Sequence, residues 1–317
     1  MLMQSLLLDF LRVTESAAVS VMPWVGSGDK IAADAAATNA MRDNLNKMKM
    51  EASVVIGEGE IDEAPMLYIG ETLGKGGSHD VDIAVDPIEG TTPTVNGQGN
   101  AITVIAAAPK GTLLHAPDMY MKKLAVGPKA KGKIDINQSI ETNLKAVVAA
   151  NGKDIRELNV LIQDRPRHQE YVKRIRNTGA KAHLFNDGDV IYATATCIEK
   201  LDIDLFFGIG GAPEGVIGAT SIRSLGGEMQ AKLMPRNDDE IRRCKEMGIM
   251  DVEGVLTTEQ LVGSDDCVFV ATGITDNLII DGIDMEYGNY ITHSILVNGR
   301  EKQVRYVKST YPIKQMV

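Results

Sequence analysis

The sequence predicts a layered α/β (α+β) protein, and three observations carry this prediction. Hydrophobic residues make up 44% and charged residues 24% of the 317-residue chain, a composition that supports a large buried core. In the second half, segments with strand-like patterns alternate with segments of helical spacing, which is typical of a three-layer α/β unit. Several strand-like segments also end at a glycine beside an acidic residue, where α/β proteins often place functional side chains.

The first half begins with helical patterns and continues with strand patterns. Apolar residues recur at helical spacing between Leu6 and Ala18, and an alanine-rich segment predicts a second helix from about Lys30 to Lys47. β-Branched or alternating runs then predict strands at Ala52–Ile56, Val81–Val85, Ala101–Ala106, Thr112–Leu114 and Lys123–Val126.

The second half reads as alternating strands and helices. The strands are expected at Asn159–Ile162, Lys181–Phe185 and Ile203–Phe207, and the helices at His168–Asn177, Val190–Cys197 and Glu214–Ile222. We expect a boundary near Gly152, after a helix around Glu141–Ala150. The predicted parts are an N-terminal α+β half, 1–152, and a C-terminal α/β half, 153–317.

Charge and composition exclude several classes of partner. The net charge is −10, and no dense block of Lys and Arg provides the basic stripe of a general nucleic-acid binder. The longest uncharged stretch lies between Glu89 and Lys110 and contains too many polar residues to span a bilayer. The three cysteines have no metal-like spacing, and the N-terminus lacks a basic signal-peptide region. We therefore expect reduced thiols and a cytoplasmic protein, with no nucleic-acid or membrane partner.

The strongest chemical pattern is an acidic turn after the strand Val81–Val85. The segment Asp86–Thr91 reads Asp-Pro-Ile-Glu-Gly-Thr, so its two carboxylates can point to one side. Carboxylates that lie close together repel unless a cation joins them, and oxygen ligands of this kind suit Mg²⁺ or Mn²⁺. The alternative is a solvated acidic turn, which the nearby Gly57-Glu58-Gly59-Glu60 makes less attractive. Asp34, among helical alanines, either faces solvent or binds a metal ion.

Other candidates follow strands of the second half. Arg165-Pro166-Arg167-His168 offers guanidinium forks for a phosphate, although such clusters are often mere surface features. Asp187-Gly188-Asp189 follows the next strand. The glycine loop at Gly208 lacks the third glycine of a dinucleotide fingerprint, because that position is Pro213, which instead suits the start of a helix.

These motifs resemble those of a known family. Gly57-Glu-Gly-Glu60, Asp86–Thr91 and Gly210-Gly-Ala-Pro-Glu-Gly215 resemble the lithium-sensitive, metal-dependent sugar and inositol phosphatase superfamily. Longer blocks extend over nearly the whole chain and look like class II fructose-1,6-bisphosphatases of the bacterial type. They are Arg12–Ala17, Gly28–Lys30, Val55–Gly70, Ala116–Tyr120, Pro166–His168, Asp187–Asp189 and Ala271–Ile274.

The resemblance implies an α-β-α-β-α layered sandwich and a set of functional residues. The implied metal ligands are Asp34, Glu58, Asp86, Glu89 and Glu214, for Mn²⁺ or Mg²⁺. The implied substrate contacts are Glu89, Gly90, Thr91, Tyr120, Arg165, Pro166, Arg167, Asp187, Gly188, Asp189 and Gly211. Lys30, in Gly28-Asp29-Lys30, is a further and weaker candidate cation for an anionic substrate, with a surface or packing role as the alternative. The resemblance also implies gluconeogenesis and a homodimer or homotetramer.

The expected reaction is hydrolysis of the 1-phosphate of fructose 1,6-bisphosphate to fructose 6-phosphate and phosphate. Water activated by the metal ions would attack, with Thr91 orienting it and Glu58 or Asp62 helping to remove its proton. Arg165 and Arg167 would hold the remote phosphate.

Three alternatives remain open at this point. Sedoheptulose 1,7-bisphosphate presents the same reactive end, so the chain could act on it as well or instead. Asp187-Gly-Asp189 nearly fits the motif of phosphatases with an aspartyl nucleophile, but Ile191 stands where that motif requires Thr or Val. A non-enzymatic phosphosugar sensor would not need the Thr91 hydroxyl.

Overall fold

A computed structural model describes residues 2–58, 67–77 and 79–313, which divide into two compact units. The first unit comprises residues 1–111 and 266–317, and the second comprises residues 112–265. The predicted α/β (α+β) fold class is confirmed, because each unit pairs a mixed sheet with helices. None of the described helices is long and apolar enough to cross a membrane.

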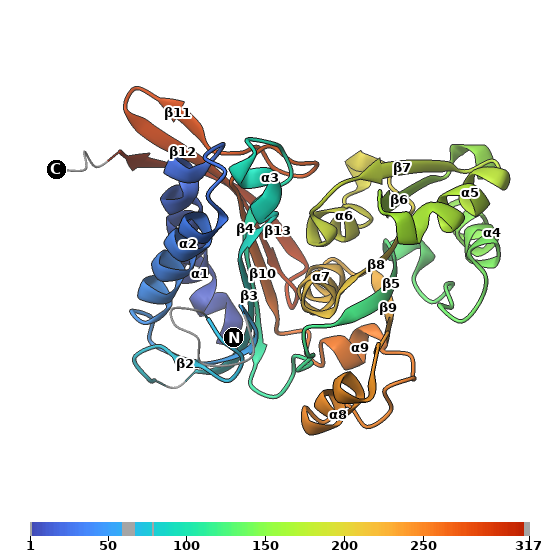
Figure 1. Cartoon of the computed structure of the whole chain (residues 1–317), viewed down its shortest axis with the longest axis horizontal. Coiled ribbons are helices and arrows are strands. Elements are labelled where there is room, and N and C mark those ends of the chain that lie inside the picture. Colours follow the sequence, from blue (N-terminus) through green and yellow to red (C-terminus); the bar gives the residue numbers. More distant parts are fainter. Residues whose placement is uncertain (1, 59–66, 78, 314–317) are drawn as a thin grey trace. The chain divides into compact units, whose positions relative to one another are not determined.

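The first unit consists of an eight-stranded sheet with α1 and α2 packed together on it (Figure 1). Its elements are α1 (Leu2–Val21), η1 (Met22–Trp24), α2 (Lys30–Leu45), β1 (Glu51–Ile56), β2 (Thr72–Leu73), β3 (Asp80–Glu89), α3 (Thr91–Val95), β4 (Ile102–Pro109), β10 (Val268–Gly273), β11 (Asp284–Glu286), β12 (Asn289–Asn298) and β13 (Gln303–Pro312). The core joins Phe10 of α1 and Met41 of α2 to sheet residues such as Ile83. Burial of these side chains fixes both helices against the sheet.

The second unit has a five-stranded sheet in the order β7-β6-β8-β5-β9. Its elements are β5 (Tyr120–Val126), η2 (Pro128–Ala130), α4 (Ile140–Asn151), η3 (Ile155–Glu157), β6 (Asn159–Gln163), η4 (Pro166–His168), α5 (Gln169–Asn177), β7 (Lys181–Phe185), α6 (Asp189–Ala195), η5 (Glu199–Leu201), β8 (Leu205–Gly211), α7 (Ala212–Ser224), β9 (Glu228–Leu233), α8 (Asp238–Glu246) and α9 (Thr258–Leu261).

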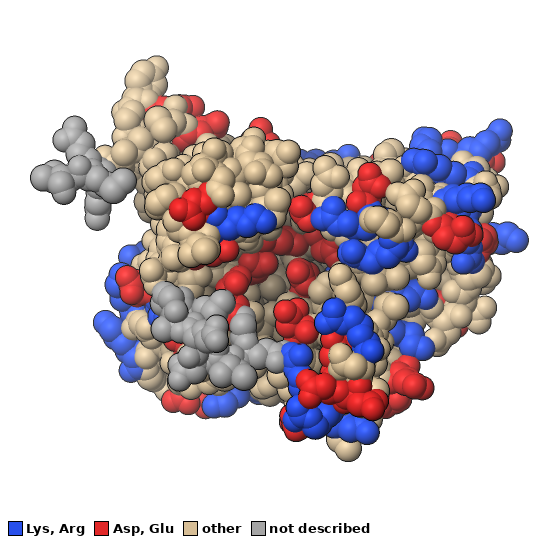
Figure 2. All heavy atoms as spheres, in the orientation of Figure 1, with Lys and Arg blue, Asp and Glu red and all other residues tan. Residues whose placement is uncertain are grey.

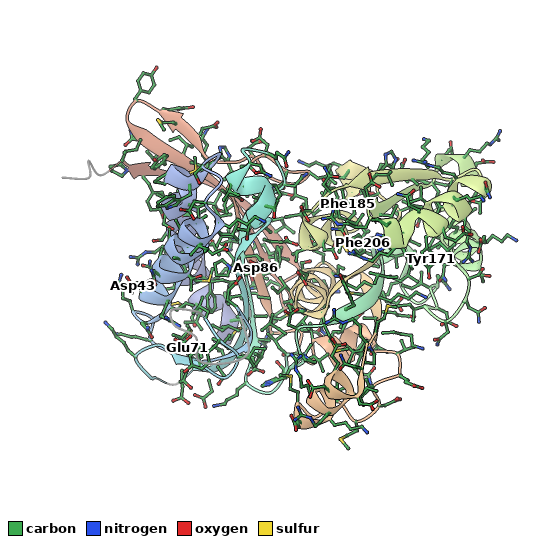
Figure 3. All side chains as sticks on the ribbon, viewed as in Figure 1. Asp43, Glu71, Asp86, Tyr171, Phe185 and Phe206 are labelled. Carbon is green, nitrogen blue, oxygen red and sulfur yellow. The ribbon has the colours of Figure 1, made fainter. Side chains whose placement is uncertain are left out.

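Helices cover both faces of this second sheet (Figure 1). Leu124 and Val126 of β5 pack in one core with Leu144 of α4 and Ile175 of α5. Lys123 points to the opposite face, toward α7. Phe185 of β7 and Phe206 of β8, labelled in Figure 3, stack with ring centroids 6.1 Å apart. Successive side chains of a strand point to opposite faces of the sheet, so every second residue of β5 faces α7.

The expected division at residue 152 does not coincide with the two units. Gly152 ends α4 inside the second unit, in a left-handed conformation that lets the chain turn. The C-terminal segment returns to the first unit, because β10 pairs antiparallel with β4 from Val268↔Ala107 to Gly273↔Ile102. Pairing between strands so distant in sequence cannot be read from local patterns.

Two expected strands differ in the structure. Thr112–Leu114 forms no strand; Leu113 makes only an isolated bridge to Val262. The strand expected at Ile203–Phe207 is β8, which runs from Leu205 to Gly211 and so includes part of the glycine loop. The strands β10 to β13 were not predicted from the sequence. Cys197, Cys244 and Cys267 are free thiols.

Candidate active-site residues in the two units

In the first unit, the parallel pairing of β1 and β3 places Glu58 and Asp86 toward the carboxyl ends of two neighbouring strands. Ile56 of β1 is paired with Ala84 of β3, and each acidic residue follows two positions later. The Glu58 backbone N–H donates to the Leu67 carbonyl at 2.8 Å. A Cβ atom on Gly57 would lie 2.0 Å from that carbonyl oxygen, so only glycine permits this approach. Asp62 lies outside the described residues.

The turn at Asp86–Thr91 interrupts the pairing of β3 with β4. The register shifts between Asp86 and Glu89, so both carboxylates sit in an irregular segment of the sheet. Asp86, labelled on β3 in Figure 3, accepts the Ile88 N–H at 3.0 Å, which fixes the turn. Glu89 is buried. Gly90 has φ of 94°, a left-handed conformation that begins α3.

Asp34 and Thr91 are joined by a hydrogen bond. The Thr91 hydroxyl lies 3.0 Å from Asp34 Oδ1 and 3.2 Å from the Ile88 carbonyl. Burial raises the pKa of Asp34, while the hydrogen bond from Thr91 and the charge of Lys30 act against the rise. Lys30 Nζ donates to the Thr92 hydroxyl at 2.8 Å. The first unit thus brings Lys30 and Asp34 of α2 to the start of α3.

In the second unit, the expected substrate residues meet at one edge of the sheet. β6 runs parallel to β7 and β8, so the segments that follow these three strands all begin at the carboxyl ends of the strands, on one side of the sheet. These segments contain Arg165–Arg167, Asp187–Asp189 and Gly211–Glu214. Tyr120 begins the antiparallel strand β5 and is paired with Gly211.

The segment after β6 is held by its own side chains. Arg165 forms an ion pair with Asp187 at 2.7 Å. Arg167 donates through Nε to the Ile209 carbonyl at 2.6 Å and through Nη2 to Gln163 Oε1 at 2.9 Å. Pro166 is the first residue of η4, where its fixed φ suits a helical turn. Arg165 and Arg167 are therefore aligned before any ligand binds.

His168 fastens the same segment to β8, a role that sequence reasoning missed. Its Nε2 atom accepts the Ile209 N–H at 2.8 Å, so its Nδ1 atom donates to the Gln163 carbonyl at 2.7 Å. The ring is fully buried, and burial lowers the pKa of His168, which favours the neutral form that accepts the Ile209 N–H. The sequence around His168 indicates only the basic pair Arg165 and Arg167.

Lys123 is the second residue that sequence reasoning missed. Its side chain is 1% exposed, and Nζ lies 2.6 Å from Asp189 Oδ2 and 3.0 Å from the Gly211 carbonyl. A Cβ atom on Gly210 would lie 2.4 Å from Asp189 Oδ2. The glycine loop of β8 therefore makes room for a buried ion pair. In the sequence, a lysine within an otherwise apolar strand was the feature that could have indicated a buried ion pair.

Glu214 lies in the first turn of α7 and folds back over Gly211. A Cβ atom on Gly211 would lie 1.9 Å from Glu214 Oε2, so the glycine lets the Glu214 carboxylate occupy this position. Burial raises the pKa of Glu214, and the charge of Lys123 opposes the rise. Among the described residues, buried Glu214 Oε2 has no hydrogen-bond partner.

Comparison with known proteins decides the family. The family model described as "Bacterial fructose-1,6-bisphosphatase, glpX-encoded" matches residues 4–311. The chain belongs to this family. It is 47% identical to a fructose-1,6-bisphosphatase class 2 of Haemophilus influenzae over 97% of this chain and 96% of that protein. It is 45% identical to fructose-1,6-bisphosphatase 1 class 2 of Escherichia coli K12, over 97% of this chain and 95% of that protein.

The class II membership expected from the motifs is therefore confirmed. Similarity to solved structures is weaker: an extragenic suppressor from Pyrococcus furiosus matches at 14% identity with a TM-score of 0.29, covering 56% of this chain and 64% of that one. That likeness carries no argument about function.

The carboxylates of this family member fit a divalent metal by their chemistry. Within the described residues, no three His, Cys, Asp or Glu side chains form a recognisable metal cluster. The buried Glu214 Oε2 nevertheless lacks a donor in the part of the chain that the structure describes, which is costly for a carboxylate without a cation. Carboxylate oxygens alone suit Mg²⁺ or Mn²⁺ rather than structural zinc.

Proposed function

We propose that this chain is a metal-dependent fructose-1,6-bisphosphatase, which hydrolyses the 1-phosphate of fructose 1,6-bisphosphate to fructose 6-phosphate and phosphate. The observation that carries the proposal is the full-length similarity to class 2 fructose-1,6-bisphosphatases, at 47% and 45% identity. The arginine-rich sheet edge of the second unit supports it, because aligned guanidinium groups suit phosphate oxygens.

The metal-binding residues in this proposal are Asp34, Glu58, Asp86, Glu89 and Glu214. Bound divalent cations offset the charge of the phosphate and make water a stronger nucleophile. The irregular turn of β3, which holds Asp86 and Glu89, and the buried Glu214 Oε2 atom without a donor among the described residues support this proposal.

Thr91 orients the attacking water in this mechanism. Its hydroxyl donates to Asp34 Oδ1 at 3.0 Å, so the lone pairs of Thr91 Oγ1 remain available to accept a hydrogen bond from water. Glu58 or Asp62 takes the proton of that water. Measuring kcat for Asp62→Asn tests this assignment, and near wild-type turnover would exclude Asp62 as the base.

The substrate-binding residues in this proposal contact different parts of the substrate. Arg165 and Arg167 hold the remote phosphate, and Tyr120 contacts the same end of the substrate. Lys30, Glu89, Gly90 and Thr91 contact the reacting end, and the segment Asp187–Asp189 with Gly211 contacts the sugar. Binding energy at the remote end then positions the scissile bond.

The test is phosphate release from fructose 1,6-bisphosphate with Mn²⁺, with Mg²⁺ and with EDTA. We expect turnover with either metal and none with EDTA. Thr91→Ala should lower kcat about 100-fold or more, since loss of the correct position of a reacting group costs about that much. Thr91→Ser, which keeps the hydroxyl, is the matched control and should retain most activity. Folded protein without turnover under any of these conditions would refute the proposal.

Four finer statements belong to the same proposal. The family would lie within the lithium-sensitive phosphatase superfamily, so Li⁺ should inhibit phosphate release. The resident metal would be Mn²⁺ or Mg²⁺. The protein would be cytoplasmic. It would also be a homodimer or homotetramer, and sedimentation at micromolar concentration would measure this oligomeric state.

A further inference from the structure

The guanidinium groups of two arginines lie close to the ring of Tyr120. The Cζ atom of Arg167 lies 5.1 Å from the ring centroid, and that of Arg236 lies 5.6 Å from it. Both distances fall within the range of cation–π contacts, about 6 Å. Arg167 follows β6 and Arg236 follows β9, whose C-terminal residue Leu233 is paired with Met121 beside Tyr120. The chain thus directs two guanidinium groups to one partly exposed aromatic ring.

Arg236 is held in place by a buried carboxylate. Its Nε and Nη2 atoms donate to Glu240 Oε1 at 2.8 and 2.6 Å, and its backbone N–H donates to Glu240 Oε2 at 2.7 Å. The Glu240 side chain is 4% exposed, whereas the Arg236 side chain is 63% exposed. Among the described residues, Nη1 of Arg236 has no hydrogen-bond partner. The guanidinium is therefore fixed on one edge and open to a ligand on the other.

The charges at this ring favour an anion. Arg167 bonds only to the neutral oxygens of Gln163 and Ile209 among the described residues. Glu240 offsets the charge of Arg236, and Asp118 adds a weaker negative influence on it. Arg165 is paired with Asp187. Among the described residues Arg167 consequently has no acidic partner, and a phosphate bound close to Tyr120 would supply the missing negative charge.

We infer that Arg236 is a substrate-binding residue that acts with Arg167, beside Tyr120, on the phosphate remote from the one that is hydrolysed. This inference rests on the proposed function and adds to it, because Arg236 is absent from the residues expected from family resemblance. Two guanidinium groups on one aromatic ring would also make the site selective for sugar bisphosphates over monophosphates hydrolysed at the same end.

The experiment compares the bisphosphate with two ligands that each carry only one of its phosphates. Wild type, Arg236→Met and Arg236→Lys are assayed for hydrolysis of fructose 1,6-bisphosphate and of fructose 1-phosphate, which lacks the remote phosphate. Binding of fructose 6-phosphate, which carries only that phosphate, is measured by calorimetry and needs no turnover. Arg242→Met is the matched control, since Arg242 lies on α8, the helix that carries Glu240, and is paired with Asp239 and Glu246. Figure 2 shows basic and acidic side chains intermingled near the bottom of the view, where Figure 1 places this helix.

We expect Arg236→Met to raise KM for fructose 1,6-bisphosphate about 10- to 100-fold, the usual effect of losing a hydrogen bond to a charged group. The kinetics of fructose 1-phosphate should not change, and fructose 6-phosphate should bind correspondingly more weakly. Arg236→Lys should fall between, because lysine keeps the charge but not the planar fork. Arg242→Met should behave as wild type.

Glu240→Gln separates binding from structure, because it removes the ion pair and keeps Arg236. Glu240→Gln should therefore weaken fructose 6-phosphate binding less than Arg236→Met does. An equal loss on both phosphosugars in Arg236→Met would show that Arg236 only supports α8 and would overturn the inference. Unchanged binding of fructose 6-phosphate by Arg236→Met would overturn it as well, whatever the turnover. Absence of wild-type turnover would instead count against the proposed function alone.

Discussion

Replacing Lys123 by methionine should destabilise the second unit strongly. The Lys123 side chain is 1% exposed and the Asp189 side chain 10% exposed, and their charged atoms lie 2.6 Å apart. Methionine fills most of the volume but leaves the Asp189 carboxylate buried and uncompensated. It also removes the donor to the Gly211 carbonyl. Breaking a buried pair in this way costs about 3–5 kcal/mol of the free energy of unfolding.

Urea unfolding followed by circular dichroism measures this loss. Lys129→Met is the matched control, because Lys129 and Glu199 form an exposed pair at 3.2 Å with side chains 69% and 87% exposed. Exposed pairs contribute about 0–1 kcal/mol, so this variant should unfold nearly as wild type does. The double variant Lys123→Met/Asp189→Asn should recover much of the lost stability, since no buried charge remains. A loss below about 1 kcal/mol in Lys123→Met would refute the reasoning.

Two further outcomes follow from the same region. Gly211→Ala should push Glu214 Oε2 away by more than about 1 Å, because its Cβ would lie within 1.9 Å of that atom. Metal–oxygen distances tolerate only about 0.2 Å. Metal titration should therefore show weaker binding. Gly218→Ala, whose Cβ would make only ordinary contacts at 3.6 Å, should bind metal normally and gain stability in α7. The unfolded chain titrates His168 near pH 6.5, whereas the folded protein keeps it neutral to lower pH. Unfolding free energy should thus fall as pH drops below 6.5, by at most about 1.4 kcal/mol per pH unit from this group. His168→Gln should remove that contribution, and an unchanged pH profile in this variant would contradict the prediction.

Local sequence patterns predicted much of the fold where one segment decides its own structure. The strand–helix alternation after Asn159 appears as β6 to α7, because the hydrophobic periods of these segments differ clearly. The acidic turn at Asp86–Thr91 was also visible, since proline and glycine fix its geometry locally. The strand β10 was missed because its pairing with β4 joins segments far apart in the chain, and β12 and β13 join the sheet through β10.

The sequence by itself determined the family and the chemical types of the candidate site. Long motifs such as Val55–Gly70 are specific enough to indicate relatives, and carboxylates beside arginines indicate a metal and a phosphate. Only the tertiary structure decided what each polar side chain contacts. Burial makes Lys123 the partner of Asp189. Hydrogen bonds to Gln163 and Ile209 fix the tautomer of His168, and Glu240 holds Arg236 close to Tyr120. Desolvation and hydrogen-bond geometry depend on atoms supplied by distant segments, so no local pattern can report them.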